Sequence, residues 1–307
     1  MEWNPLVSII IPLYNGSNYI EEAISCALKQ TYQNIEIVVV NDGSTDDGAG
    51  RDICQKYIDK IVYVEKENGG CASALNHGVR IAKGEYVSWL SHDDLYDNDK
   101  IERQIRLIKE KQLDVNNTVI SNPARLISGT GKKIFHPTPK TKGFFNSKKA
   151  YRYLLHRKTF NGCGLLIPKG IFQRTNYFEE SMRYILDWDL WLKFAIADVD
   201  FYLDNKIIVS NRCHGAQVTV KQKQLYQVET TQMIKSLFER LKVNEDTFYL
   251  KELCYFAYGT KRDGWKEIKA YCKEKNIRLC WVRSALLRTK SNIINCMKKV
   301  YHKLRKR

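Results

Sequence analysis

Two adjacent carboxylates, Asp93 and Asp94, come directly after an apolar, strand-like run at residues 86–90, with no lysine or arginine beside them. In open α/β sheets, ligands collect at the carboxyl ends of the strands. Oxygen ligands there suit a divalent cation, and Mg²⁺ typically reaches phosphates through one or two carboxylates. A solvated turn or a helix N-cap is the simpler interpretation of an acid pair in isolation. The surrounding motifs therefore decide between a cation site and a turn.

Polar residues also follow two earlier strand-like runs. Pro12 and Tyr14 follow the β-branched run at residues 6–11, and Asp42 follows the run at residues 35–40. Because the carboxyl ends of parallel strands share one edge of the sheet, we expect these residues on the same rim as the acid pair. There, Asp42 could accept a hydrogen bond from a base N–H or a sugar hydroxyl.

Two further segments have a structural explanation beside a functional one. Asn68 and Gly69 precede a predicted helix, where small residues let backbone N–H groups approach a ligand. A glycine pair at this place also simply forms a turn. Ser44 or Thr45 fits the N-cap of the preceding predicted helix.

Strands alternate with helices over the first hundred residues, which predicts a parallel sheet with right-handed crossovers. The strands are expected at residues 6–11, 35–40, 60–64 and 86–90, and the helices at 17–30, 45–57 and 70–82. Further helices are expected at 100–111, 147–156, 187–197 and 225–241, and further strands at 118–121, 164–167 and 206–213. Residues 128–145, rich in Gly, Pro, Thr and Lys, are expected to form a mobile loop.

The composition is that of a soluble globular protein, with 307 residues, 44% hydrophobic and 27% charged. No stretch approaches the roughly 18 apolar residues of a membrane span, and the acidic start is unlike a secretory signal, so we expect a cytoplasmic protein. Nine scattered cysteines never form Cys-x-x-Cys. This pattern argues against a disulfide framework and against a structural zinc site.

The net charge of +16 implies an anionic partner and is concentrated near the C-terminal end. Residues 275–307 contain eleven lysines and arginines and no acid, and their apolar residues recur at helical spacing. Such a helix suits the surface of an anionic membrane, and packing on the rest of the protein is the structural alternative. A nucleic-acid partner is not expected, although salt-sensitive RNA or DNA binding by this tail would indicate one.

Five motifs occur in a fixed order: Val7–Asn15, Asn41–Asp46, Asn68–Asn76, Gly84–Val87 and the pair Asp93–Asp94. Together they resemble the nucleotide-binding half of the family 2 glycosyltransferases, closely over residues 5–100 and more loosely to residue 219. The resemblance implies an α/β protein of the GT-A fold, a Rossmann-like, mostly parallel sheet flanked by helices. The domain would span residues 1–219, with residues 1–100 as the nucleotide-binding half, 101–219 as the acceptor half and 220–307 as a helical C-terminal extension.

The resemblance also implies roles for individual residues. Those that would bind the sugar-nucleotide donor are Pro12, Tyr14, Asp42, Asn68, Gly69, His92 and Arg212. Among them, Asp42 would bond the base, which is usually uracil. Asp93 matches the metal-binding acid of the family's Asp-x-Asp motif, with Asp94 and His214 as further metal ligands. Ser91 stands where the first acid of that motif is usual, which leaves fewer protein ligands for the Mn²⁺ or Mg²⁺ ion.

Asp187 falls on the position of the family's catalytic base, beside Leu186, which replaces a glutamate. A carboxylate at a helix N-terminus can accept the proton of an attacking hydroxyl, and a helix cap is the alternative interpretation. Arg212 and His214 resemble a later family segment near the donor diphosphate, where either side chain could donate to phosphate oxygens. For His214, a purely structural role is the alternative.

The resemblance implies an inverting glycosyltransferase that moves a sugar from a nucleotide-diphosphate sugar, most often a UDP-sugar, to an acceptor hydroxyl. The acceptor would be a saccharide or a lipid-linked saccharide of a cell-surface polysaccharide. A sugar nucleotidyltransferase is an alternative, but residues 12–17 lack the basic Gly-rich segment usual after its first strand. The absence of Gly-x-Gly-x-x-Gly after every predicted strand argues against an oxidoreductase. A non-enzymatic protein that binds anionic polymers through its tail is the remaining alternative.

Overall fold

The computed structural model describes residues 3–138, 141–156, 160–215, 224–244, 246–259 and 265–279. The chain divides into two compact units, of which the first comprises residues 1–150 and 159–223 and the second residues 151–158 and 224–307. All strands of the described residues belong to the first unit. The predicted basic helix of the tail lies from residue 280 onward outside the described residues.

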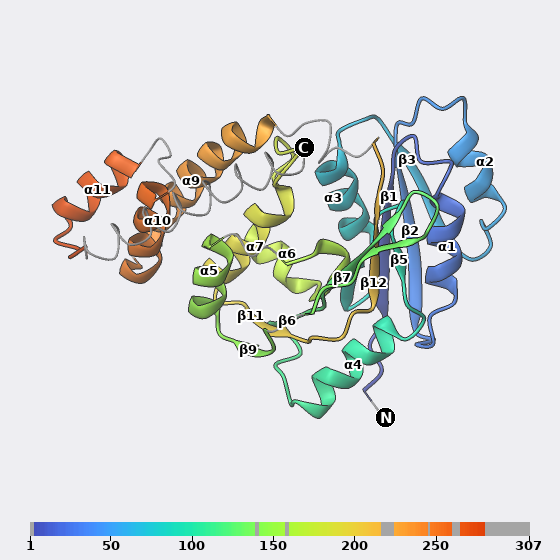
Figure 1. Cartoon of the computed structure of the whole chain (residues 1–307), viewed down its shortest axis with the longest axis horizontal. Coiled ribbons are helices and arrows are strands. Elements are labelled where there is room, and N and C mark those ends of the chain that lie inside the picture. Colours follow the sequence, from blue (N-terminus) through green and yellow to red (C-terminus); the bar gives the residue numbers. More distant parts are fainter. Residues whose placement is uncertain are drawn as a thin grey trace, which may run out of the picture. The chain divides into compact units, whose positions relative to one another are not determined.

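The first half of the large sheet is parallel, as the strand–helix alternation predicts. Strand β1 lies between β2 and β4, with β3 at the outer edge, and all these neighbours run in the same direction. Helices α1 and α2 cover one face and α3 covers the other (Figure 1). The bounds are β1 Val7–Leu13, α1 Ile20–Leu28, β2 Ile35–Asp42, α2 Ala49–Gln55, β3 Val62–Lys66, α3 Cys71–Ile81 and β4 Tyr86–Trp89.

The second half of the same sheet is mixed, in the order β4-β10-β6-β11-β9. Strand β10 runs antiparallel to both β4 and β6, β11 runs parallel to β6, and β9 runs antiparallel to β11. The bounds are α4 Lys100–Glu110, β6 Thr118–Ser121, β9 Gly143–Phe145, α5 Ser147–Leu155, β10 Leu165–Pro168, α6 Gly170–Thr175, α7 Leu186–Ile196 and β11 Asp200–Leu203. The sequence pattern does not predict β11, which has only four residues and follows α7 almost directly.

A second sheet of four short strands has the order β5-β12-β7-β8. Strand β12 (Val209–Cys213) pairs antiparallel with β5 (Leu95–Tyr96) and parallel with β7 (Ala124–Ser128), and β8 (Lys133–Phe135) forms the outer edge. Strands β8 and β9 lie inside the segment that the sequence predicts as a loop, and β12 begins at residue 209 rather than 206. This sheet joins the chain just after the acid pair to a strand more than a hundred residues later.

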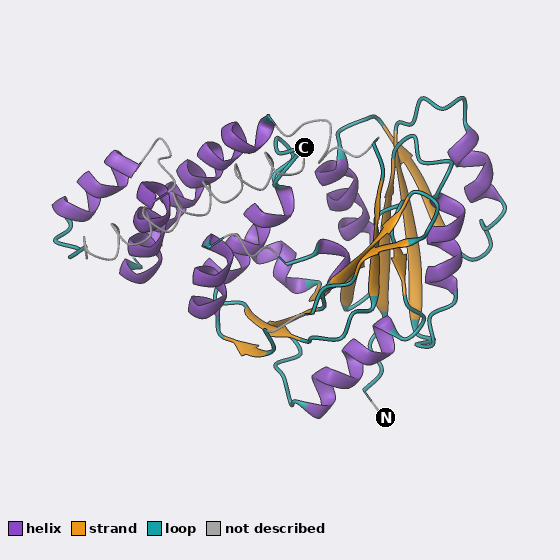
Figure 2. Cartoon of the chain, viewed as in Figure 1, coloured by secondary structure: helices purple, strands orange, loops and turns teal. Residues whose placement is uncertain are grey.

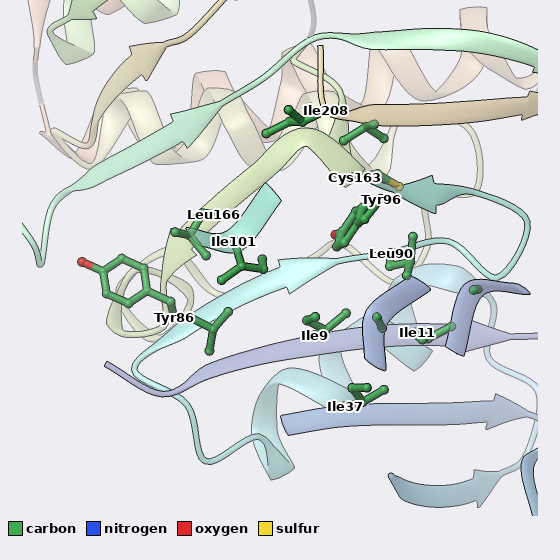
Figure 3. Close-up of a cluster of buried hydrophobic side chains, with 14 of the residues drawn as sticks. Ile9, Ile11, Ile37, Tyr86, Leu90, Tyr96, Ile101, Cys163, Leu166 and Ile208 are labelled. Carbon is green, nitrogen blue, oxygen red and sulfur yellow. The ribbon is translucent and has the colours of Figure 1, made fainter. Parts of the chain in front are cut away.

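The core explains why the first strands are continuous apolar runs. Every residue of β1 is buried, as expected for a parallel strand covered by helices on both faces. Ile9, Ile11 and Ile37 pack in one cluster with Tyr86 and Leu90, and Figure 3 shows these side chains between neighbouring strands. This packing fixes the strand ends on which the polar residues stand.

The second unit, as far as it is described, is helical (Figure 2). Its helices are α9 (Leu225–Asn244), α10 (Thr247–Gly259) and α11 (Trp265–Glu274). Helix α9 includes the long amphipathic helix that the sequence predicts at residues 225–241. Leu250 and Leu253 of α10 are fully buried, so this unit has its own apolar core.

Candidate active site

Asp42 lies at the end of β2 and is almost completely buried, with 2% of its surface exposed. One of its carboxylate oxygens accepts hydrogen bonds from Lys66 Nζ at 2.8 Å and from the backbone N–H of Gly69 at 3.0 Å. The other oxygen accepts from the backbone N–H of Gly70 at 2.6 Å. The Asn68 side chain donates to the carbonyl oxygen of Asp42 at 2.9 Å. Asp42 therefore anchors the loop that leads into α3.

The loops after β1 and β2 are bound to each other. The Asn15 side chain accepts from the backbone N–H of Thr45 at 2.7 Å, and the Asn15 backbone donates to Ser44 Oγ at 3.0 Å. Tyr14 is 46% exposed beside them. A cavity of about 440 Å³ opens at this end of β2 and β3, and Asn41 and Lys66 are among its lining residues. Tyr14 is not among the residues that line this cavity, although the cavity and Tyr14 lie on the same rim of the sheet.

Asp93 and His214 meet after β4 and β12, respectively. Nε2 of His214 lies 2.9 Å from Oδ2 of Asp93, and the His214 ring packs on Tyr19 with centroids 5.1 Å apart. The backbone of Asp93 is held as well, because Arg212 Nε donates to its carbonyl oxygen at 2.9 Å. The sequence predicts these residues at one site, and the structure brings their side chains into contact.

Arg212 is 2% exposed. Besides Asp93, its guanidinium donates to the Gly129 carbonyl at 2.9 Å and to Glu22 Oε2 at 2.9 Å. It also lies 4.5 Å from the centroid of the Tyr19 ring. The sequence predicts that Arg212 contacts phosphate directly. A guanidinium that donates to three protein oxygens is instead suited to positioning the Asp93 segment.

Asp94 points into the protein, toward β12. Its carboxylate accepts from Asn211 Nδ2 at 2.5 Å, from the backbone N–H of Arg212 at 2.9 Å and from Cys163 Sγ at 3.2 Å. Burial, and then the neighbouring charge of Asp93, raise the pKa of Asp94 to about 7. Both of its oxygens are thus engaged by protein groups.

His92 closes the gap between the ends of β1 and β4. Its Nδ1 lies 3.3 Å from the carbonyl oxygen of Pro12, and burial lowers its pKa. The ring lies so close to Gly16 that a Cβ there would be 2.2 Å from it. A side chain at position 16 would therefore displace His92 from the rim.

Asp187 lies in the first turn of α7, as the sequence predicts, and is partly buried. Burial raises its pKa to about 6, although the backbone N–H of Trp188 donates to its carboxylate at 2.7 Å. The segment that leads into α7 is tied to α3, because the Asn76 side chain bonds both the N–H and the carbonyl of Phe178 at 2.9 Å. A carboxylate with a pKa near 6 is ionised at neutral pH and remains a competent base.

Cys71, in the first turn of α3, reports how these acids converge. Burial raises the pKa of its thiol to about 12, and the charges of Asp42, Asp187 and Asp93 add to the rise in that order. All three carboxylates therefore act on one point, although 145 residues separate the first from the last in the chain. The acids predicted to bind the nucleobase, to bind the metal and to accept the acceptor proton are thus the ones whose charges reach this thiol.

The donor set of Asp93 and His214 fits a divalent cation. One carboxylate oxygen and one imidazole nitrogen suit Mn²⁺, and Mg²⁺ sites commonly use one or two carboxylates together with substrate phosphates. In the described part of the chain, no three side chains of His, Cys, Asp or Glu gather into a metal cluster. The remaining ligands of a bound ion would therefore come from the diphosphate and water.

Three residues of the site are not assigned by sequence reasoning. Lys66 ends β3 beside Asp42, and its position after a third parallel strand is a signal that could have identified it. Asn211 binds Asp94 from within a motif noted in the sequence. Arg183 donates to the carbonyl of Gly69 from four residues before Asp187, and nothing in the local sequence predicts this contact.

Known proteins are similar to this chain over the region that contains most of the site residues. The model of the family described as glycosyl transferase family 2 matches residues 8–180, which is more than half of the chain. The chain belongs to glycosyl transferase family 2. The match includes the rim residues up to Asp94 and ends shortly before Asp187.

Several curated glycosyltransferases are also similar to this chain. An uncharacterized glycosyltransferase of Rickettsia typhi is 40% identical over 275 residues, which cover 88% of this chain and 83% of that protein. The glycosyltransferase GlyG of Streptococcus pneumoniae is 33% identical over 69% of this chain and 72% of its own length. An uncharacterized glycosyltransferase of Rickettsia bellii is 45% identical over 218 residues, but the chain spans only 31% of that longer protein.

Solved structures support the family 2 fold. TarS of S. aureus, residues 1–349 in complex with UDP-GlcNAc, matches with a TM-score of 0.65 at 18% identity, over 82% of this chain and 72% of that one. The mannosyltransferase PcManGT from Pyrobaculum calidifontis, in complex with GDP-Man and Mn²⁺, matches with a TM-score of 0.58 at 18% identity, over 95% and 81%. These likenesses confirm the predicted GT-A fold.

Proposed function

We propose that this chain transfers a sugar from a nucleotide-diphosphate sugar, most suitably a UDP-sugar, to an acceptor hydroxyl with inversion at the anomeric carbon. The proposal rests on three carboxylates and their places in the structure: Asp42 at the end of β2, Asp93 after β4 in contact with His214, and Asp187 in the first turn of α7. They come from the nucleotide end, the metal end and the acceptor half, which are the three parts that single-displacement transfer needs. TarS bound to UDP-GlcNAc supports a UDP-sugar as donor.

Asp187 is the proposed general base. It takes the proton of the acceptor hydroxyl while the hydroxyl oxygen forms its bond to the anomeric carbon. The bond from that carbon to the diphosphate oxygen breaks on the opposite face, and the nucleoside diphosphate leaves with the electron pair. A single carboxylate base, rather than two carboxylates flanking a water, distinguishes this reaction from glycoside hydrolysis.

Asp93 and His214 are the proposed ligands of Mn²⁺ or Mg²⁺. When bound, the ion supplies positive charge at the leaving diphosphate, and the Mn²⁺ complex of PcManGT supports this expectation. Because both oxygens of Asp94 accept hydrogen bonds from protein groups, we assign Asp94 mainly to holding β12 against the site. Pro12, Tyr14, Asn68, Gly69 and His92 are retained as the proposed donor-binding residues around Asp42.

The proposed acceptor is a saccharide or lipid-linked saccharide of a cell-surface polysaccharide. TuaG of Bacillus subtilis, a putative teichuronic acid biosynthesis glycosyltransferase, is 42% identical over 114 residues and supports this class of acceptor. Of the helices that the structure describes, none is long and apolar enough to cross a membrane. Attachment of a cytoplasmic enzyme to an anionic membrane through the basic tail stays a proposal.

Donor hydrolysis and transfer by the full chain, measured across UDP-, dTDP- and GDP-sugars with Mn²⁺ or with EDTA, test the proposed function. We expect one donor class to be used, with loss of activity in EDTA. Asp187→Asn should reduce transfer by about 10²- to 10⁴-fold and leave donor affinity unchanged. Asp59→Asn, at an exposed position, serves as the control that should retain full activity. Unimpaired transfer by Asp187→Asn would refute the assignment of the base.

A further inference from the structure

The hairpin formed by β7 and β8 carries two consecutive exposed apolar side chains. Ile134 is 58% exposed and Phe135 is 56% exposed. Strand β8 is the outer strand of the four-stranded sheet, and every residue from 130 to 136 is exposed. Both side chains of the pair are therefore left uncovered by the residues that the structure describes.

A β-bulge explains this arrangement. Leu126 pairs with Phe135 and Ile127 pairs with Lys133, so Ile134 is the extra residue on β8. A bulge re-aims side chains and interrupts the ladder of an edge strand, and a lysine at the edge also opposes the addition of another strand. The edge is therefore a poor template for pairing with a second copy, while its apolar side chains stay exposed.

The stretch of sequence that contains the hairpin carries charged side chains of one sign. Residues 115–178 contain twelve lysines and arginines and no aspartate or glutamate. Lys132 and Lys133 directly precede the apolar pair, and His136 directly follows it. All three are exposed. An apolar tip with a basic flank is complementary to a surface that is negatively charged outside and apolar beneath.

We propose that the tip of this hairpin, residues 132–136, inserts into the interfacial region of an anionic lipid bilayer. Ile134 and Phe135 would enter the boundary between headgroups and acyl chains. Lys132 and Lys133 would contact the anionic headgroups, which attract basic residues near the membrane surface. This surface belongs to the first unit and consists of other residues than the predicted basic tail.

The contacts of Gly129 relate this surface to the active site. Gly129 lies in the turn of the hairpin, and its carbonyl accepts from Arg212, which also donates to the carbonyl of Asp93. One buried arginine therefore joins the turn to the proposed metal site. Bilayer binding does not require the transfer reaction, but its use rests on the proposed function, since it would present a lipid-linked acceptor beside Asp93.

Co-sedimentation of the full chain with vesicles tests the proposal. Vesicles of phosphatidylcholine with about one third phosphatidylglycerol are compared with vesicles of phosphatidylcholine alone. We expect binding to the anionic vesicles and a roughly tenfold lower partition coefficient for the double variant Ile134→Ser with Phe135→Ser, because two apolar side chains lose their burial. Lys132→Gln with Lys133→Gln should weaken binding to anionic vesicles and remove much of its dependence on salt.

The matched control is Ile58→Ser with Val62→Ser, since these residues are 51% and 42% exposed, before β3 and at its first residue. It should bind vesicles like the unchanged chain. All variants keep the basic tail, so any contribution of the tail is common to them. Equal binding by the hairpin variant and the control, or equal binding to both vesicle types, would overturn the proposal.

Affinity for UDP, measured on the same proteins, separates this inference from the proposed function. The hairpin variants should bind UDP as the unchanged chain does. If the unchanged chain binds vesicles but no nucleotide, the proposed function fails while the membrane surface stands. If UDP binds and the hairpin variants lose no vesicle binding, the membrane surface fails alone.

Discussion

The two ends of the rim hold their acids in different ways. At the nucleotide end, Asp42 is bound by Lys66, Gly69 and Gly70, which lie 24 to 28 residues later in the chain. At the metal end, the Asp93–Asp94 pair is bound by β12 and its continuation, 117 to 121 residues away. The first end is a product of one βαβ unit, whereas the second exists only after two distant parts of the chain have paired.

The difference predicts how far the effect of a substitution at either end should extend through the structure. A change at the nucleotide end disturbs a loop that parallel strands on either side still support. A change at the metal end removes contacts between two sheets, so it should affect catalysis and folding together. The following experiments compare residues from the two ends, test Asp187, which belongs to neither end, and test Lys66 beside Asp42.

The largest expected difference is between Asp93→Asn and Asp42→Asn. Loss of the charged metal ligand should lower kcat/KM by about 10³-fold, because the charge of the leaving diphosphate is then poorly neutralised. Asp42→Asn should mainly raise the KM for the donor. Steady-state kinetics with varied donor and varied Mn²⁺ checks this, and equal effects on kcat would remove the distinction between the ends.

Asn211→Ala and Asn68→Ala compare the two ends in stability. Asn211 donates to the buried Asp94, so its loss leaves a buried carboxylate oxygen with one partner fewer and should cost about 2 kcal/mol in the free energy of unfolding. Asn68 is itself exposed, so water can take its place as donor to the Asp42 carbonyl, and its loss should cost less than about 1 kcal/mol. Urea denaturation measures both, and a larger loss for Asn68→Ala would contradict this interpretation.

The pH dependence of transfer tests Asp187, which belongs to neither end. Burial raises its pKa in the folded protein to about 6, and only the ionised form can accept the acceptor proton. Activity should therefore be half-maximal near pH 6 and fall about tenfold for each further pH unit below that.

The same shift in the pKa of Asp187 means that the folded protein binds the proton more tightly than the unfolded chain does. The stabilisation from this carboxyl is therefore full below its ordinary pKa and is lost as the pH rises through about 6.

A pH–rate profile for kcat measures the prediction on transfer, with donor kept saturating. The exposed-site variant Asp59→Asn should give the same profile. An acidic limb that lies near pH 4 would show that burial does not set the pKa of the base.

The smallest expected effect is that of Lys66→Met. Lys66 Nζ lies 2.8 Å from Asp42, but two backbone N–H groups also hold that carboxylate. We expect a change of a few-fold in the KM for the donor, no change in kcat, and about 1 kcal/mol of lost stability. Lys60→Met, at an exposed position before β3, is the control. A large fall in kcat would place Lys66 among the residues that act on the reaction itself.

The parallel half of the fold is predictable because its signals are local. Continuous β-branched runs such as residues 6–11 predict buried parallel strands, and the rim residues follow them directly. The sequence alone therefore suffices to place Pro12, Tyr14, Asp42 and Asp93 on one edge of the sheet. The start of α7, predicted at Asp187 and found at Leu186, follows in the same way from a helical pattern with an acid in its first turn.

The other contacts depend on pairing that no local pattern encodes. Strand β12 must lie between β5 and β7 before Asn211 can reach Asp94, and sequence spacing carries no information about that choice. The same holds for Arg212, whose charge suggests a ligand for phosphate but whose burial commits it to protein oxygens. Short strands inside residues 128–145 are also invisible to composition, because Gly, Pro and Lys at their ends dominate the pattern.

Arg212 also determines the order in which parts of the rim can form during translation. It bonds Glu22 in α1, Gly129 in the hairpin turn and the carbonyl of Asp93, so all three must wait for a residue that is made 119 residues after Asp93. Chains are made from the N-terminus at roughly 5–20 residues per second. For at least several seconds, therefore, the nascent chain has the strands of its nucleotide end available for pairing while Asp93 has no partner from β12. During translation, the loops around Asp42 can therefore form before Asp93 and Asp94 gain their contacts with β12 and His214.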